Sequence, residues 1–200
     1  NRSRLYGEYD DAERYAYFCK AVLDMLPELD FYPDILHAHD WQAALSVVYL
    51  NLYYRHDARY GDIRTVFTIH NIEYQGKYDF SILGDVFAIG CEHCLLMNYD
   101  GCINLMKAAI ECADRVSTVS PRYAEEILSP EYAHGLHHCL RNHTGKLRGI
   151  PSDGMLCSMG ELKLTEHDMP GKEENGILIL DADCEDRIGD DIRDVLMLND

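Results

Sequence analysis

The sequence predicts an α/β fold built on a parallel sheet, because three short apolar runs typical of buried strands alternate with segments of helical length. The three runs occupy residues 33–41, 65–71 and 115–120. Enough chain separates them for the crossover connections that parallel strands require. Each run also ends in polar residues, which predicts a polar edge at the carboxyl ends of the strands.

The first element along the chain is a helix expected over residues 10–29. Its apolar side chains recur at helical spacing, at Phe18, Ala21, Val22, Met25 and Leu26. Asp10 is a suitable residue to cap the first turn, and Pro27 and Pro33 limit the helix at its carboxyl end.

The next elements form the first strand–helix unit and the second strand. PDILHAHDW predicts a buried strand that turns polar at His37, His39 and Asp40, and residues 41–54 predict the helix that follows it. TVFTIHN predicts a second strand of the same design, which stops at the histidine and asparagine of this string. A loop that contains glycine, IEYQGKYD, comes after it.

The last elements before residue 150 are a helix, a strand and a helix. CINLMKAAIECA predicts the first of these helices, and RVSTVS predicts the third strand. RYAEEILS predicts the final helix, with Pro121 in its first turn, where proline is favoured.

Composition indicates a soluble globular protein with a buried core, since 47% of the 200 residues are apolar. The net charge of −17 argues against binding to nucleic acid or to anionic membranes, because an acidic surface repels phosphate groups. Residues 151–200 alone hold 14 acidic and 4 basic residues. This shift predicts a boundary near Pro151, with one unit over residues 1–150 and another over residues 151–200.

The eight cysteines fit either disulfides or reduced thiols. The chain begins at Asn1 and shows no basic start followed by an apolar secretion segment, and no apolar run reaches the roughly 18 to 20 residues that a membrane span needs. We therefore expect a cytoplasmic protein with reduced thiols.

Polar residues at the strand ends predict a ligand cleft at one edge of the sheet, because loops and helix N-termini converge there. Its expected lining is Asp40, Trp41, His70, Asn71, Ser120 and Tyr123. The Asp-Trp-Gln string at residues 40–42 suits hydrogen bonding to hydroxyls and stacking on a sugar ring. The alternative is a helix-capping aspartate followed by a tryptophan of the core.

Two further patterns carry weaker interpretations. His70 and Asn71 either orient a ligand hydroxyl or satisfy loop backbone groups. Asn104 and Lys107 lie three residues apart on the helix predicted for CINLMKAAIECA, so they could reach one ligand, although a lone helical lysine is usually solvated.

Two cysteine and histidine clusters have spacings found in metal sites, but neither predicts one. Cys91-Glu92-His93-Cys94 has the spacing of half a zinc site without a second half. The second cluster consists of His134, His137, His138, Cys139 and His143. Its first and third histidines are one helical turn apart, but HExxH is absent and Gly135 disfavours a helix. We expect no metal and no cofactor.

Five strings, taken together and in this order, resemble bacterial glycogen (starch) synthase: LYGEYDDAERYAYFCKA, PDILHAHDWQAAL, TVFTIHNIEYQGKYD, INLMKAAIECADRVSTVSPRYAEEI and HGLHHCLRNHTGKLRGI. They cover residues 1–150 almost continuously. The resemblance implies an incomplete Rossmann-like N-terminal domain of the two-domain GT-B fold. It also implies a retaining glucosyltransferase that moves glucose from ADP-glucose to the non-reducing end of an α-1,4-glucan.

The same resemblance implies a substrate-binding site of seven residues: Asp40, Trp41, Gln42, His70, Asn71, Asn104 and Tyr123. The first three are expected to face the sugar and the acceptor. The histidine and asparagine of the TIHN string are expected to hydrogen-bond the transferred glucose. The last two residues are expected near the same cleft.

Two parts of the family pattern are not found in the sequence: the glycine loop whose lysine contacts the nucleotide sugar, and the second Rossmann domain that binds the diphosphate. Charge develops on the leaving diphosphate in the transition state, so we expect that this chain alone transfers no glucose. Two alternatives stay open: a non-catalytic fragment that binds glucan or sugar nucleotide, and a rearranged gene product without a selected function. The oligomeric state is also open.

The last 50 residues resemble a different family. PSDGMLCSMGELKL and NGILILDADCEDRIGDDIRDVLMLND are similar to the OB-like, tRNA-binding domain of the phenylalanyl-tRNA synthetase β subunit. The resemblance implies a short, partial β-rich tail joined at residues 147–150. Its acidic charge argues against independent tRNA binding, and we expect loose attachment rather than docking on the sheet.

Overall fold

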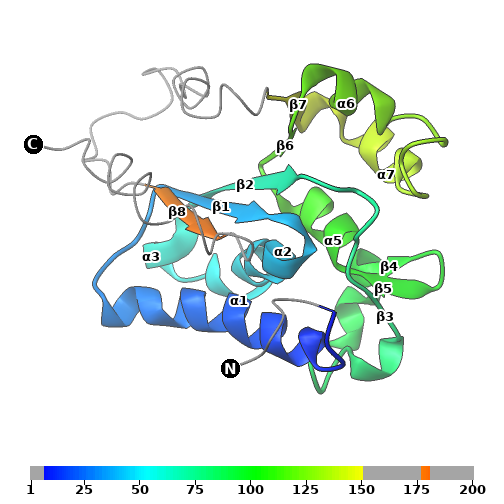
Figure 1. Cartoon of the computed structure of the whole chain (residues 1–200). Helices are drawn as coiled ribbons and strands as arrows, with labels where there is room; N and C mark the ends of the chain where they lie inside the picture. Colours follow the sequence, from blue (N-terminus) through cyan, green and yellow to red (C-terminus); the bar gives the residue numbers. More distant parts are fainter. Residues whose placement is uncertain (1–6, 151–176, 181–200) are drawn as a thin grey trace, which may run out of the picture.

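A five-stranded sheet organises the part of the chain that the structure, a computed structural model, describes: residues 7–150 and 177–180 (Figure 1). The strands lie in the order β7-β6-β2-β1-β8, and all neighbours are parallel. They are β1 Ile35–His39, β2 Arg64–Ile69, β6 Arg115–Thr118, β7 Leu147–Gly149 and β8 Ile177–Leu180. The predicted α/β fold with a parallel sheet is therefore confirmed, and the three predicted strands are adjacent at its centre.

Helices cover this sheet and connect its strands. The α-helices are α1 Asp11–Glu28, α2 Asp40–Tyr49, α3 Ala58–Gly61, α4 Cys94–Met97, α5 Leu105–Cys112, α6 Pro121–Glu126 and α7 His137–Asn142. A π-helix, η1 Leu50–Tyr54, continues α2, and the 3-10 helices are η2 Phe80–Ile82, η3 Cys91–His93 and η4 Thr144–Lys146. Figure 1 shows α1, α2 and α5 on one side of the sheet. Within the described ranges, no helix is both long and apolar enough to cross a membrane.

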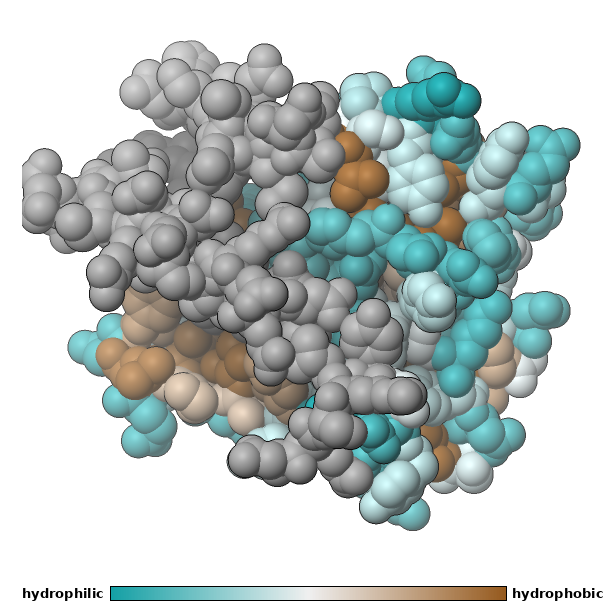
Figure 2. Space-filling view, in the orientation of Figure 1, coloured by the Kyte–Doolittle hydropathy of each residue, from teal (hydrophilic) through white to brown (hydrophobic). Residues whose placement is uncertain are grey.

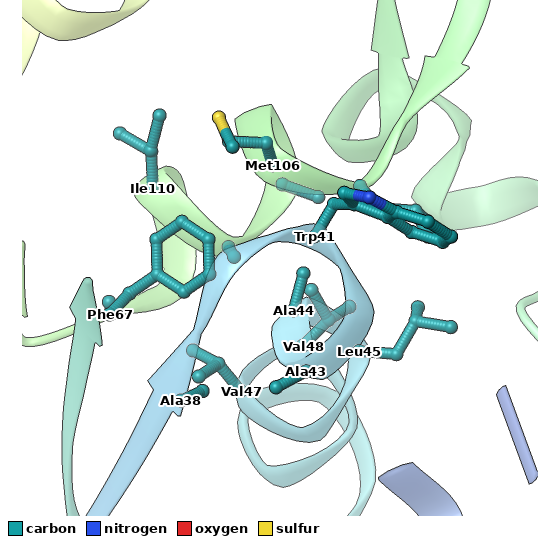
Figure 3. Close-up of a cluster of buried hydrophobic side chains, with 14 of the residues drawn as sticks. Ala38, Trp41, Ala43, Ala44, Leu45, Val47, Val48, Phe67, Met106 and Ile110 are labelled. Atoms are coloured by element: carbon teal, nitrogen blue, oxygen red, sulfur yellow. The ribbon is translucent and has the colours of Figure 1, made fainter. Parts of the chain in front are cut away.

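The helix α2 lies at the centre of the core. Its residues Ala43, Ala44, Val47 and Val48 are fully buried. Figure 3 shows why: one side of α2 faces β1 and β2, where Ala38 and Phe67 lie, and another side faces Met106 and Ile110 of α5. A helix that is apolar on all sides is expected to be buried on all sides. This packing fixes the position of the β1–α2 junction.

The first predicted helix is confirmed as α1, which ends one residue after Pro27. The predicted cap is wrong, because the side chain of Asp10 makes no capping hydrogen bond. Asp11, the first residue of the helix, instead ties down the preceding loop, because its Oδ2 accepts from the backbone N–H of Gly7 at 2.5 Å and of Glu8 at 3.1 Å.

The outer surface of α1 is apolar towards its carboxyl end. Met25 is 51% exposed and Leu29, which follows the helix, is 61% exposed. Figure 2 shows hydrophobic surface in this part of the molecule. The helix thus buries one apolar face against α2 and leaves further apolar side chains on the outside.

A second, antiparallel sheet corrects the helix predicted for CINLMKAAIECA. Its strands are β3 Lys77–Tyr78, β4 Asn98–Tyr99 and β5 Cys102–Asn104, in the order β3-β5-β4. Asp100 and Gly101 link β4 to β5 and have φ values of 53° and 79°. This Asp-Gly pair forms a two-residue hairpin turn, so the first three residues of the string are a strand and α5 begins at Leu105.

The tail prediction falls mostly outside the described residues. Neither the partial OB-like fold nor the boundary near Pro151 is tested there. The exception is β8, which pairs in parallel with β1 so that Ile35 lies opposite Ile177 and Ala38 opposite Leu180. The expected loose attachment is therefore wrong for these four residues, which extend the sheet beyond β1.

Candidate functional site

The aspartate that follows β1 connects the ends of the two central strands. Asp40 Oδ1 accepts a hydrogen bond from the backbone N–H of His70 at 2.8 Å and a longer one from Asn71 at 3.5 Å. Asp40 has a φ of 54°, in the left-handed region that aspartate tolerates better than most residues. The strained junction and the carboxylate together fix the loop after β2 beside the start of α2.

A pair of histidines lies at the same sheet edge. His39 Nδ1 and His70 Nε2 are 2.8 Å apart, and the two rings are stacked with their centroids 5.1 Å apart. One of these nitrogens donates and the other accepts, so the contact fixes the two rings relative to each other. His39 is only 3% exposed, and it was not selected from the sequence as a site residue. The signal available was its position at i+2 from His37, which places both rings on one face of β1.

A row of polar side chains runs across three strands next to this pair. His37 Nε2 lies 2.7 Å from Thr68 Oγ1, which lies 2.6 Å from Ser117 Oγ. The ring of His37 also packs on that of His39, with centroids 4.2 Å apart. Burial, together with the nearby His39 and His70, lowers the pKa of His37 to about 3. His37 is therefore neutral at physiological pH.

This burial predicts an acid-sensitive fold. The unfolded chain takes up a proton at His37 below its ordinary pKa of 6.5, whereas the folded chain does not until about pH 3. Stability from this group is fully present above pH 6.5 and falls as the pH drops, by up to about 1.4 kcal/mol per pH unit. The free energy of unfolding, measured with urea at several pH values between 7.5 and 5, should fall less steeply with decreasing pH for His37→Gln than for the wild type. Equal slopes would contradict the prediction.

Tyr123 brings α6 to the same edge. Its hydroxyl accepts a hydrogen bond from the backbone N–H of Ile72 at 3.1 Å, and Ser120 Oγ caps α6 by accepting from Tyr123 N at 3.0 Å. Burial, with a smaller contribution from the charge of Asp40, raises the pKa of Tyr123. Asn71 is exposed in the loop between them, where its Oδ1 accepts from Glu73 N. The structure thus gathers Asp40, His70, Asn71 and Tyr123.

Trp41 and Gln42 lie in the interior. Trp41 is 8% exposed, and its ring meets Tyr15 edge-on with the centroids 5.1 Å apart and also packs against Tyr78. Gln42 is 5% exposed, and its backbone carbonyl accepts from Cys19 Sγ. These positions match the alternative of a core tryptophan. Direct stacking of Trp41 on a sugar ring stays a prediction without support from this arrangement.

Asn104 is also in the interior and does not converge with Lys107 on a ligand position. It is fully buried, and its Oδ1 caps α5 by accepting from Lys107 N at 2.9 Å. Its Nδ2 donates to Gln75 Oε1 at 2.8 Å. Lys107 Nζ points instead to α4, where it donates to the carbonyls of Leu95 and Leu96. Both side chains hold the loop before α5 in place, and Lys107 is not solvated as a lone helical lysine usually is.

The two cysteine and histidine clusters lie on other elements than the four gathered residues. Cys91 and Cys94 lie in η3 and at the start of α4. His134 has a φ of 46° and precedes α7, which begins at His137, so His134 and His138 do not share a helix. Across residues 7–150, no three or more His, Cys, Asp or Glu side chains are grouped as metal ligands.

Substitutions of Asp40 can separate the stability that comes from its hydrogen bonds from the stability that comes from its tolerance of a positive φ. Asp40→Ala loses both the hydrogen bonds and the tolerance of a positive φ, and we expect a loss of about 2 kcal/mol. Asp40→Gly removes only the hydrogen bonds and should lose about 1 kcal/mol, while Asp40→Asn should lose less than either. Chemical denaturation of the three variants measures this order. If glycine costs as much as alanine, the backbone strain plays no part.

Comparison with known proteins identifies the family to which the chain belongs. Residues 1–142 match the family model described as starch synthase catalytic domain. The chain belongs to the starch synthase catalytic domain family. The glycogen synthase of Streptococcus mutans is 46% identical over 151 residues, which are 74% of this chain and 32% of that protein. The glycogen synthase of Streptococcus pneumoniae serotype 2 is 37% identical over 205 residues, which are 96% of this chain and 41% of that protein.

A solved starch synthase structure shares the fold. The catalytic domain of starch synthase IV from Arabidopsis thaliana, bound to ADP and acarbose, superposes with a TM-score of 0.66 and 36% identity. The match covers 76% of this chain and 33% of that one. The chain therefore spans about a third of the length of the Streptococcus mutans glycogen synthase and of the starch synthase IV catalytic domain.

Proposed function

We propose that this chain forms part of the site of a retaining glucosyltransferase that moves glucose from ADP-glucose to the non-reducing end of an α-1,4-glucan. Membership of the starch synthase family supports the reaction. The observation that carries the proposal for this chain is the cluster at the sheet edge, where Asp40 fixes the backbone of His70 and Asn71. Donors and acceptors held in place at such an edge can bind sugar hydroxyls without further ordering.

We assign two roles within the seven predicted residues. Asp40, His70, Asn71 and Tyr123 surround the sugar, with His70 and Asn71 as hydrogen-bond partners of the transferred glucose. Trp41, Gln42 and Asn104 act from the interior, where they support the β1–α2 junction and the loop before α5. The partners are ADP-glucose and the glucan; the acidic charge argues against nucleic acid.

We propose that the chain alone binds without transferring glucose. The four residues that surround the sugar include no lysine or arginine to stabilise the charge on the leaving diphosphate. Purified protein incubated with ADP-glucose and maltohexaose should release no ADP above the level without protein. Sustained turnover would contradict this statement.

Ligand binding tests the site separately from turnover. Saturation-transfer NMR with maltohexaose should detect weak binding that Asn71→Ala reduces severalfold. Asn51→Ala is a matched control, because Asn51 is exposed in η1 and outside the gathered site. Equal loss in both variants, or no binding to the wild type, would contradict the proposed site. Binding without turnover favours the non-catalytic fragment over the gene product without a selected function.

We also propose that residues 151–200 derive from a segment similar to the tRNA-binding domain of phenylalanyl-tRNA synthetase, joined to residues 1–150. The acidic shift in this segment supports this division, whereas the alignment with the Streptococcus pneumoniae glycogen synthase covers 96% of the chain and so extends past residue 150. A single sequencing read across the codons for residues 146–154 tests it. A read that continues from residue 150 into the remainder of a glycogen synthase would contradict the fusion. We further propose that the protein is located in the cytoplasm, where thiols stay reduced.

A further inference from the structure

Cys91 and Cys94 occupy a single tight turn away from the proposed sugar site. The turn consists of η3 and the first residue of α4. The backbone N–H of Cys94 donates to the carbonyl of Cys91, and that of His93 donates to Gly90 at 3.0 Å. The hydrogen bond between the two cysteines themselves is the i to i+3 bond that defines a 3-10 turn.

This turn places the two thiols on one side of the backbone. Side chains at i and i+3 eclipse each other in a 3-10 helix, and a rise of about 2 Å per residue separates their Cα atoms by about 6 Å. A disulfide requires a Cα separation of roughly 4.4 to 6.8 Å. The backbone of the reduced turn therefore already has the spacing that a Cys91–Cys94 disulfide needs.

Accessibility distinguishes Cys91 from the other cysteines between residues 7 and 150, since it is the exposed one among them. Cys91 is exposed and Cys94 is half-buried, whereas Cys19 and Cys139 are buried. Burial raises the pKa of both Cys19 and Cys139 to about 12, and that of Cys112 to about 11, so these thiols stay protonated and unreactive. The half-buried Cys102 donates its thiol to the carbonyl of Tyr99.

We propose that Cys91 and Cys94 form a redox-active dithiol that closes to an intramolecular disulfide by exchange with a low-molecular-weight disulfide such as oxidised glutathione. The exposed thiolate of Cys91 attacks one sulfur of glutathione disulfide, and one glutathione thiolate leaves. Cys94 then attacks the sulfur of Cys91 in the mixed disulfide and releases the second glutathione. The two thiol protons end on the two glutathione molecules, so the protein is oxidised by two electrons and the glutathione disulfide is reduced.

The disulfide closes directly before a segment that anchors α5. The carbonyls of Leu95 and Leu96 in α4 accept from Lys107 Nζ at 2.9 and 2.8 Å, and Lys107 also pairs with Glu111 at 3.0 Å. A covalent link across the first turn of this segment restricts its opening. The amides of residues 94–97 should therefore exchange with solvent several-fold more slowly in the oxidised protein.

The test uses the full chain, reduced and then incubated with glutathione disulfide. After alkylation and proteolysis, mass spectrometry should find the peptide that contains residues 91–94 lighter by two hydrogen atoms and unalkylated. Cys102→Ser is the matched control and should form the same link. In Cys94→Ser the link cannot form, and Cys91 should instead retain a glutathione adduct. Circular dichroism verifies that each variant is folded.

Three outcomes would overturn the proposal. The first is a peptide that stays alkylated at both cysteines while glutathione disulfide is in excess. The second is a stable glutathione adduct on Cys91 in the wild type, which would show that Cys94 cannot reach it. The third is a disulfide that joins Cys91 or Cys94 to a cysteine elsewhere in the chain.

Discussion

Gly149→Ala is expected to destabilise the protein by about 3 kcal/mol or more, although it adds a single methyl group. Gly149 ends β7, where α6 packs closely against the strand. A Cβ atom at this position would overlap the carbonyl of Ser120 and the Cα of Pro121. Both are backbone atoms at the start of α6, so the helix itself must shift, and overpacking of this kind costs about 1–3 kcal/mol or more.

Gly145→Ala is the matched control for this prediction. Gly145 lies in η4, four residues earlier, and a Cβ there would meet nothing within 4 Å. Without a clash, alanine reduces the entropy of the unfolded chain, which stabilises a protein by about 0.4–1 kcal/mol. Urea denaturation of both variants should place their midpoints on opposite sides of the wild type. A Gly149→Ala variant as stable as the control would show that α6 and β7 do not pack as closely as the structure has them.

The central strands and the helix between them could be predicted because local and global signals agree there. PDILHAHDW and TVFTIHN are short apolar runs with polar ends, and they become β1 and β2 with their polar residues at one edge. The helix predicted from residue 102 begins only at Leu105, because Asp100 and Gly101 form a hairpin turn that makes Cys102–Asn104 a strand. This dipeptide is a strong turn signal, and giving it weight would have assigned Cys102–Asn104 to a strand.

The site was predictable in its location but not in its contacts. Residues directly after a strand, such as Asp40 and His70, meet because parallel strands end at the same edge. Whether Trp41 faces this cleft or the core depends on the left-handed φ of Asp40, which turns the chain at that point. The contact between His39 and His70 depends on the register that places His39 opposite Thr68. Neither feature is encoded in a local pattern.

Asp114→Ala is expected to cost about 3 kcal/mol, because this carboxylate joins three separate parts of the fold. Its Oδ2 accepts from the backbone N–H and the hydroxyl of Thr65, at 2.8 and 2.9 Å, and from Arg55 Nη2 at 2.9 Å. Thr65 lies in β2, Arg55 follows the π-helix η1, and Asp114 itself precedes β6. Hydrogen bonds to a charged group contribute about 1.5–3 kcal/mol, and the alanine variant also leaves the half-buried Arg55 without this partner.

The same carboxylate predicts a second acid-sensitive step, at lower pH than the one expected from His37. Burial alone would raise the pKa of Asp114, but the hydrogen bonds from Thr65 and the charge of Arg55 outweigh it and hold the pKa below its ordinary value of 3.8. The stability it contributes is therefore fully present above pH 3.8 and is lost as the pH falls through the lower pKa of the folded state.

Asp114→Asn separates the charge from the hydrogen bonds. Its amide oxygen can still accept from Thr65, so we expect it to lose less stability than Asp114→Ala at pH 7. The part of the loss below pH 4 that comes from Asp114 should disappear from both variants, while the part that comes from His37 remains. Thermal unfolding followed from pH 7 down to about pH 3 measures the two effects in one series. If the wild type and Asp114→Asn lose stability in parallel below pH 4, the Asp114 carboxylate is not the group that titrates.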